Sequence, residues 1–379
     1  MQETTQQWGA AVSTQGLDGV KLSKLLEDLT GFSNVSLTMS APRTHRDQGG
    51  DRASLFLQSG SMRAFSNGLQ ALALISSLGV GIASAKAAPE PLRFVVIPKV
   101  THPWFEAVRG GADDAARMIQ KQTSRKVVID YRPPAKADLD LQVTILQAAI
   151  RSKPSGITID LLDATRLKPL LEMAGREGIP ITVFDSEPPA GLTIPSIGAD
   201  FCEQARITAM RLAKLISGQG EVAIMRGVPT APNHSIRADC QRKLFATYPG
   251  IKVVASPADN DNIETAKQQA MATMKMHPQL KGWVVTDAGG AIGVGRAIQA
   301  MGKQGSVQVV GLDDLPELLE LIKNRVVDST AASKPRSQGY WSVLTLWQQG
   351  LGAPAIQRID TGIAVLGGRA PESEPARTR

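Results

Sequence analysis

Cysteine, histidine and aromatic residues are scarce in this chain of 379 residues, which has two cysteines, four histidines and 4% aromatic residues. The cysteines, Cys202 and Cys240, lack the spacing of zinc or haem motifs. No two histidines stand three or four positions apart, the spacing that places two metal ligands on one helix face. We therefore expect neither a metal site nor a bound cofactor.

Nucleotide-binding and hydrolase motifs are also missing. The chain has no P-loop, no G-x-G-x-x-G run and no G-x-S-x-G elbow. The segment from Asp259 to Asn262 resembles the start of a calcium loop but lacks the later glycine and glutamate, so we interpret it as a helix cap. The net charge of +7 is spread without blocks of like charge, which indicates a solvated basic surface and no nucleic-acid partner.

Residues 62–87 have the layout of a secretory signal peptide. A basic residue precedes a mostly apolar stretch from Leu69 to Ile82, and Ala85-Lys-Ala87 is a small-x-small cleavage site. The apolar stretch is too short and too rich in glycine and serine for a membrane span. We expect a periplasmic mature chain, with residues 1–61 either outside the true gene product or a disordered or folded extension.

After the cleavage site, short apolar runs alternate with amphipathic stretches, and this pattern occurs twice. The runs are rich in valine and isoleucine and are bounded by glycine, proline or aspartate, which is typical of buried parallel strands. The first series is Leu92–Ile97, Lys126–Asp130, Gly156–Asp160 and Ile179–Asp185, and the second is Glu221–Met225, Ile251–Ala255, Gly282–Asp287 and Val307–Asp313. The repeat predicts two similar α/β domains with parallel sheets.

Three aspartates stand where predicted strands end, namely Asp185, Asp287 and Asp313. Any one of them could simply cap a helix. Because open α/β sheets bind ligands at the carboxyl ends of their strands, three such residues favour a shared polar site between the two domains. Carboxylates accept paired hydrogen bonds from neighbouring hydroxyls, which fits a sugar or polyol.

The segment His102-Pro-Trp-Phe follows the first predicted strand and opens the first predicted helix. Trp104 and Phe105 are either plain core residues or stack on a ligand ring, in which case His102 would hydrogen-bond that ligand.

These residues, in this order, resemble the ribose-binding type of periplasmic binding protein over about residues 92–366. His102-Pro-Trp-Phe resembles the family's Asn-Pro-Phe-Phe segment, and Gly178-Ile-Pro-Ile-Thr-Val-Phe-Asp185 resembles its Ile-Pro-Val-Ile-x-x-Asp strand. Ile197-Gly-Ala-Asp200 is similar to the domain crossover, and Ser235-Ile-Arg237 to the arginine segment of the second domain. The late strand ends at Asp287 and Asp313 match as well.

The resemblance implies a type I periplasmic binding protein, in which two Rossmann-like domains are joined by a three-segment hinge. The implied domains are 92–199 plus 334–362 and 200–333 plus 363–367. Aromatic side chains would stack on the ligand, polar ones would bond its edge, and Arg237 would be the only basic residue in the cleft. The predicted ligand-binding residues are His102, Trp104, Phe105, Asp163, Asp185, Asp200, Arg237, Asn260, Asp287, Asp313 and Ser333.

The chain also departs from the family's ribose binders. Ser186 stands where they have arginine, Phe201 where they have asparagine, and Asn260 where they have an aromatic residue. Asp287 replaces an asparagine. We therefore expect a different sugar, a polyol or another small polar molecule rather than ribose itself.

The resemblance implies a monomer that delivers its ligand to an ABC permease in the inner membrane. The alternative that stays open is a periplasmic sensor that signals to a membrane histidine kinase or chemoreceptor. A repressor effector domain is rejected because residues 1–61 contain no helix-turn-helix pattern, and no catalytic motif indicates an enzyme.

The two cysteines are expected on the first two helices of the second domain. The oxidising periplasm permits a disulfide between Cys202 and Cys240, and the other outcome is two buried free thiols.

Overall fold

The computed structural model describes residues 90–354 and 356–368. The signal peptide expected at 62–87 and the extension at 1–61 lie outside these residues. Among the described residues, no helix combines the length and apolar content that crossing a bilayer requires.

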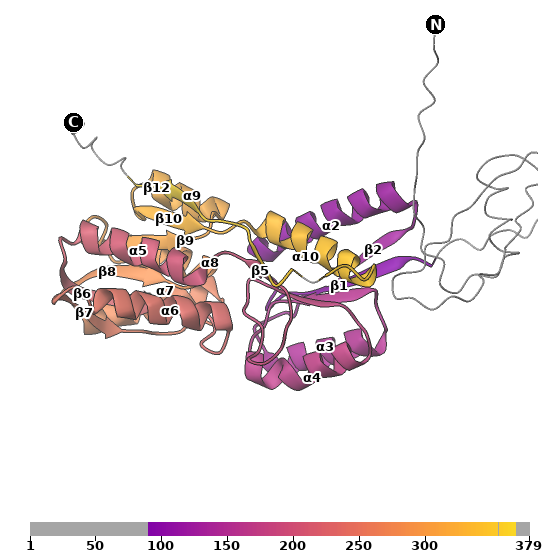
Figure 1. The fold of residues 1–379 in the computed structure, drawn as a ribbon. Helices are drawn as coiled ribbons and strands as arrows, with labels where there is room; N and C mark the ends of the chain where they lie inside the picture. The colour runs from indigo at the N-terminus through magenta and orange to yellow at the C-terminus, as the bar shows by residue number, and fades with distance from the viewer. Residues whose placement is uncertain (1–89, 355, 369–379) are drawn as a thin grey trace, which may run out of the picture. The chain divides into compact units, whose positions relative to one another are not determined.

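The first lobe is built on a six-stranded sheet with the strand order β11-β5-β4-β3-β1-β2, and each neighbouring pair is parallel (Figure 1). Its strands are β1 (Leu92–Ile97), β2 (Val127–Tyr131), β3 (Gly156–Ile159), β4 (Ile181–Phe184), β5 (Ser196–Gly198) and β11 (Arg358–Asp360). Its central strands are buried on both faces, as a sheet covered by helices on both sides requires.

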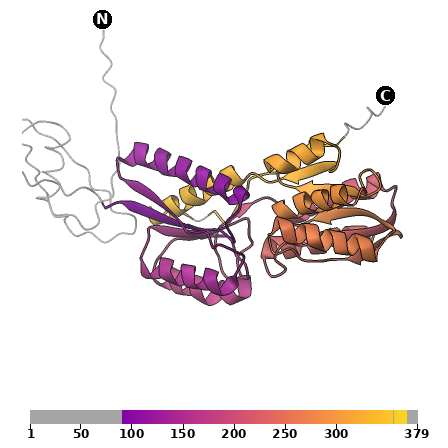
Figure 2. The same cartoon turned by 180° about the vertical axis from the view of Figure 1, so that it is seen from behind.

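Helices cover both faces of this sheet. They are α2 (Pro103–Thr123), α3 (Leu139–Arg151), α4 (Ala164–Arg176) and α10 (Pro335–Gly350). Figures 1 and 2 show α2 and α10 on one face and α3 and α4 on the other. Alternate residues of β1 follow this division, since Phe94 and Val96 belong to the core under α2, while Val95 and Ile97 pack with α3 and α4.

The second lobe has a sheet of the same design, with the strand order β12-β10-β9-β8-β6-β7. Its neighbouring strands are parallel except β12, which pairs antiparallel with β10. Its strands are β6 (Gln219–Met225), β7 (Gly250–Ala255), β8 (Leu280–Val285), β9 (Gln308–Leu312), β10 (Ser329–Ala332) and β12 (Ala364–Gly367). The predicted fold class, two α/β lobes with parallel sheets, is confirmed.

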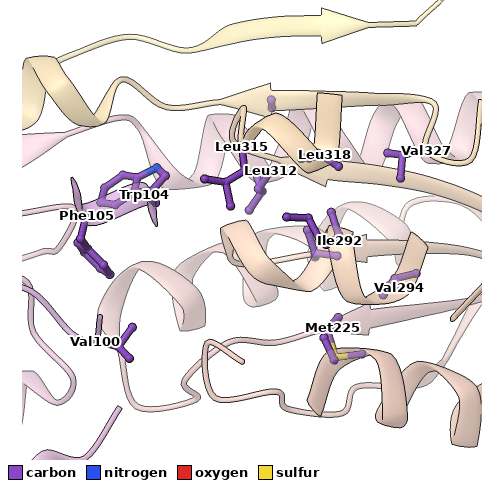
Figure 3. Close-up of a cluster of buried hydrophobic side chains, with 14 of the residues drawn as sticks. Val100, Trp104, Phe105, Met225, Ile292, Val294, Leu312, Leu315, Leu318 and Val327 are labelled. Atoms are coloured by element: carbon purple, nitrogen blue, oxygen red, sulfur yellow. The ribbon is translucent and has the colours of Figure 1, made fainter. Parts of the chain in front are cut away.

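The helices of the second lobe are α5 (Phe201–Leu215), α6 (Pro232–Phe245), α7 (Ile263–Met276), α8 (Ala288–Ala300) and α9 (Pro316–Lys323). Leu212 of α5 and Phe245 of α6 pack with one face of the sheet, and Ile292 of α8 belongs to the cluster on the other face. That cluster continues into the first lobe. Figure 3 shows Trp104 and Phe105 of α2 together with Leu312 and Leu315 of the second lobe.

The chain passes between the two sheets three times. The first passage lies between β5 and α5, the second between β10 and α10, and the third between β11 and β12. Each passage is only a few residues long, so the lobes are joined by three short segments, at 199–200, 333–334 and 361–363.

Two glycines let α2 and α10 cross in close contact. A Cβ atom on Gly111 would stand 1.8 Å from the carbonyl oxygen of Arg336, and one on Gly339 would stand 1.9 Å from that of Val108. Both obstacles are backbone atoms, so no side-chain movement can relieve the clash. The crossing fixes α2, which carries Trp104, against the helix that follows Ser333.

We predict that Gly339→Ala lowers the free energy of unfolding by about 1–3 kcal/mol or more, because the new methyl group overpacks the crossing. Gly350→Ala, at the end of the same helix, is the matched control, since nothing lies within 4 Å of its Cβ position. Urea denaturation of both variants checks this. Equal stability of the two variants would contradict the close crossing.

Candidate functional site

A small cavity lies where strand ends of both lobes meet. Its lining comes from the residues that follow β1, β4, β8 and β9, the loop between β7 and α7, the starts of α2 and α8, and α6. The lining residues are Lys99, His102, Trp104, Phe105, Asp185, His234, Arg237, Asp261, Asp287, Ala288 and Asp313.

His102 is the N-cap of α2, and Pro103 occupies the first helical position. Its Nδ1 accepts a hydrogen bond from the Trp104 N–H at 3.3 Å. Burial, with the nearby charge of Lys99, lowers the pKa of His102 to about 4. The imidazole is therefore neutral at neutral pH, and because Nδ1 accepts, its hydrogen is on Nε2. That Nε2 atom is buried and has no hydrogen-bond partner among the described residues, so it is a donor available to a ligand.

The aromatic pair is buried, with Trp104 and Phe105 each 4% exposed. Their rings meet edge to face, with centroids 5.0 Å apart. The indole Nε1 of Trp104 donates to Ser333 Oγ at 3.3 Å, and the backbone N–H of Ser333 donates to Asp313 Oδ1 at 3.1 Å. The polar edge of the indole is thereby paired with the second lobe, and this chain of bonds places Ser333 directly behind the cavity wall.

Arg237 joins the two lobes from α6. Its Nε donates to Gln204 Oε1 at 2.8 Å, and one terminal nitrogen donates to the Thr286 carbonyl at 3.1 Å. The other terminal nitrogen donates to Asp185 Oδ1 of the first lobe at 3.3 Å. The guanidinium also lies over the Phe201 ring, 4.9 Å from its centroid. The side chain is only 2% exposed. These contacts hold its guanidinium in one orientation and satisfy its buried donors.

A buried cation, Lys99, stands at the end of β1. Its Nζ is 2.9 Å from Asp160 Oδ2 and 3.9 Å from Asp185 Oδ2, and it donates to Asn233 Oδ1 at 3.3 Å. Burial opposes its charge, but the carboxylates of Asp160, Asp185 and Asp261 outweigh it and raise the pKa of Lys99. Lys99 therefore stays charged beside the cavity.

Acidic groups dominate the second-lobe side of the cavity. Asp287 caps α8, and its Oδ2 accepts from the Gly290 N–H at 2.8 Å. Burial, with the neighbouring charges of Asp261 and Asp313, raises the pKa of Asp287 to about 7. Burial likewise raises the pKa of Asp261 and of Asp313.

His234 closes this side from α6. Its Nδ1 accepts from the Val228 N–H at 2.8 Å, and burial lowers its pKa, so it too is neutral. Its Nε2 lies 3.8 Å from Asp261 Oδ1.

Seven of the residues predicted from the sequence line the cavity: His102, Trp104, Phe105, Asp185, Arg237, Asp287 and Asp313. Ser333 lies behind its wall. The other three do not line it. Asp163 caps α4 and Asp200 caps α5, and their carboxylates accept the N–H groups of Arg166 and Glu203, both at 2.9 Å. Asn260 is exposed, at a left-handed backbone position with φ of 56°.

The expectation that Arg237 is the only basic residue in the cleft is wrong, because Lys99 also lines the cavity. Lys99 follows β1 just as the aspartates follow their strands, so its position at a strand end was a usable signal. His234 stands three residues before Arg237 and shares its helix face. The sequence could not show that Asp261, rather than its neighbour Asn260, lines the cavity. The two residues lie in a turn, which has no regular period to indicate which side chain points inward.

Cys202 and Cys240 form a disulfide with their Cα atoms 5.4 Å apart. The bridge ties the first turn of α5 to α6, one helical turn after Arg237. Cys202 is exposed, so the alternative of two buried thiols does not hold.

The two lobes thus place a polar cavity with two aromatic side chains between the strand ends of their sheets. Residues 93–353 match the family model described as a periplasmic binding protein domain. The chain therefore belongs to the periplasmic binding protein family, as its resemblance to the ribose-binding type predicted.

Relatives of known function support the same class. The chain is 26% identical over 306 residues to the D-ribose/D-allose-binding protein of Pseudomonas aeruginosa, which covers 79% of this chain and 89% of the relative. It is 25% identical over 255 residues to the D-allose-binding periplasmic protein of Escherichia coli, covering 65% and 80% of the two chains. A solved ABC transporter solute-binding protein from Burkholderia graminis, in complex with D-arabinose, superposes with a TM-score of 0.68 and 27% identity, over 76% of this chain and 98% of that one.

We predict that Lys99→Met lowers the free energy of unfolding by about 3–5 kcal/mol at neutral pH, because it leaves the buried carboxyl of Asp160 without its cation. The double variant Lys99→Met with Asp160→Asn removes both charges and should recover most of that loss. Chemical denaturation of the single and double variants measures the difference. A double variant as unstable as the single one would show that the lysine contributes by packing and not by pairing.

Proposed function

We propose that this protein captures a neutral sugar or polyol in the periplasm and delivers it to an ABC importer as a monomer. One observation carries the proposal: the cavity combines two aromatic side chains with buried hydrogen-bonding atoms that have no partner among the described residues. Those atoms are a donor, His102 Nε2, and acceptors on Asp261 and Asp287. A polyhydroxylated ring supplies an apolar face for the aromatic residues and hydroxyl groups for these atoms.

The charge of the site favours a neutral ligand over an anion. Asp185, Asp261, Asp287 and Asp313 line the cavity, against the two cations Lys99 and Arg237, and both cations already bond protein carboxylates. A sugar phosphate or sugar acid would bring a further negative charge next to these groups. The names of the relatives, which bind ribose, allose or arabinose, agree with a neutral sugar.

Ligand exchange requires the lobes to separate. The cavity residues of the first lobe are bonded to those of the second, and Asp185, Arg237 and Asp287 are each at most 5% exposed. We propose that the three passages act as a hinge between domains 92–199 plus 334–362 and 200–333 plus 363–367. The ligand would favour the closed form because it contacts both domains only there.

The test of function is a thermal-shift screen of the purified protein with D-ribose, D-allose, D-arabinose, D-xylose and xylitol, followed by calorimetry. Arg237→Ala should weaken binding of the best ligand by about 2–4 kcal/mol, roughly 30- to 900-fold. The change removes buried donors and leaves the buried carboxylate of Asp185 without its guanidinium partner. Trp104→Ala should cost a comparable amount through lost stacking and buried area.

Asn260→Gly is the control for these two variants, because Asn260 lies outside the cavity. The ligand affinity of this variant should match that of the wild type. Unchanged affinity in both Arg237→Ala and Trp104→Ala would place the site elsewhere. A preference for sugar phosphates would contradict the proposal that the ligand is neutral.

Small-angle X-ray scattering tests the closure. We expect a smaller radius of gyration with saturating sugar than without, because the ligand shifts the population toward the closed form. Identical radii in the two conditions would contradict a hinge that responds to ligand.

A further inference from the structure

Helix α6, which carries Arg237 to the cavity, has little apolar packing of its own. Only Ala238 and Phe245 of this helix belong to a buried apolar cluster, and its N-cap makes no side-chain hydrogen bond. The other buried side chains of α6 are polar: Asn233, His234, Arg237 and Gln241. Because apolar burial is the dominant force that docks a helix, the orientation of α6 depends on hydrogen bonds and on any covalent link.

The beginning of α5 clamps the guanidinium of Arg237. The guanidinium carbon lies 4.9 Å from the centroid of the Phe201 ring, and Gln204 Oε1 accepts from Arg237 Nε at 2.8 Å. The amide of Gln204 is fixed in turn, because its Nε2 donates to the Ala331 carbonyl of β10 at 2.8 Å. Three of the five guanidinium N–H groups bond protein acceptors, so two remain for a ligand, and the clamp sets their direction.

The disulfide joins α5 and α6 at the level of this clamp. Cys202 lies in the first turn of α5, next to Phe201, and Cys240 stands three residues after Arg237 on α6. Residues three apart share a helix face. The Cα atoms of the two cysteines are 5.4 Å apart. The bridge therefore fixes the distance between the start of α5 and the turn of α6 that carries the guanidinium.

The bridge itself stays outside the cavity. Neither cysteine is among the residues that line it, and Cys202 is exposed. Any effect of the bridge on ligand binding must therefore pass through the residues that it holds. We propose that the disulfide between Cys202 and Cys240 is a positioning element for ligand recognition, which keeps the α5 clamp on Arg237 and so aims its two remaining N–H groups at the ligand. The inference rests on the proposed function, since it takes Arg237 as a ligand-binding residue.

The size of the effect depends on how often the guanidinium keeps its binding orientation. Ligand affinity scales with the fraction of molecules in the competent arrangement, so a clamp that is released about nine-tenths of the time lowers affinity about tenfold. We expect roughly 3- to 30-fold weaker binding in Cys202→Ser with Cys240→Ser, here called the double cysteine variant. This loss is smaller than that of Arg237→Ala because the arginine is still present.

A thermodynamic cycle tests whether the effect passes through Arg237. Calorimetry with D-ribose, D-allose and D-arabinose measures the effect of the two cysteine substitutions in wild type, in Arg237→Ala and in Trp104→Ala. The loss should appear in wild type and in Trp104→Ala and vanish in Arg237→Ala, because the effects of coupled residues do not add. Wild-type affinity in the double cysteine variant, or an equal loss in the Arg237→Ala background, overturns the proposal.

Leu321→Ala is the control for a general loss of stability. Leu321 is buried, and both Leu321 and Val327 stand against Gly295 of α8. Val327 precedes β10, so this contact lies at the opposite end of the sheet from the cavity. The variant leaves a hole in the core and lowers stability, while its ligand affinity should match the wild type. If it loses as much affinity as the double cysteine variant, the bridge acts through stability alone and the proposal fails.

Reduction of the folded wild type replaces the double cysteine variant if that variant does not fold. Dithiothreitol, a dithiol, takes up the bond as its own cyclic disulfide and leaves Cys202 and Cys240 as two thiols, which a thiol count confirms. The reduced protein should show the same roughly 3- to 30-fold loss of affinity. Unchanged affinity after complete reduction overturns the proposal.

A further readout needs no ligand. The Nε–H of Arg237 donates to Gln204 in a buried site, so it exchanges slowly with water and gives an NMR signal that is identified by its absence in Arg237→Ala. Exchange should be about tenfold faster in the double cysteine variant than in Leu321→Ala. If none of the sugars binds wild type, the proposed function fails while this comparison still decides the inference: faster exchange supports it and equal exchange overturns it.

Discussion

The buried carboxylate of Asp185 is the point on which the cavity depends, because both lobes are organised around it. Arg237 and Asn233 of the second lobe donate to its two oxygens at 3.3 and 2.6 Å, and Lys99 of the first lobe stands 3.9 Å away. A carboxylate so far from water is tolerated only when its lone pairs are filled by charged and neutral donors. The second lobe supplies most of those donors, so the position of α6 relative to β4 is set by the need to satisfy this one group.

The fold class was readable from the sequence because parallel α/β sheets leave a strong pattern. Strands buried on both faces read as continuous apolar runs, and the crossovers between them must be long enough for a helix. The shortest strands were the hardest to predict from the sequence. The strands β5, β11 and β12, which border the passages from one sheet to the other, are three or four residues long and carry too few residues to establish a period.

The site was only partly predictable. Residues at the ends of strands, such as Asp287 and Asp313, were found because the topology dictates where strand ends gather. Asp163 and Asp200 carry the same type of side chain at element boundaries, yet they cap helices outside the cavity. Composition cannot separate these two roles, since both use a carboxylate that accepts a backbone N–H. Asp287 combines both positions, because one of its oxygens caps α8 and the other, beside the cavity, has no partner within residues 90–354 and 356–368.

The disulfide between Cys202 and Cys240 makes the stability of the second lobe depend on the compartment in which it folds. The bridge closes a loop with a sequence separation of 38 residues that contains the whole of β6, and a loop of this length is worth about 4 kcal/mol in the chain-entropy account. Thiols stay reduced inside most cells, whereas an oxidising compartment closes the bond. The same amino-acid sequence therefore encodes a less stable protein in a reducing compartment than in an oxidising one, and the exposed position of Cys202 leaves the bond accessible to the enzymes that form it.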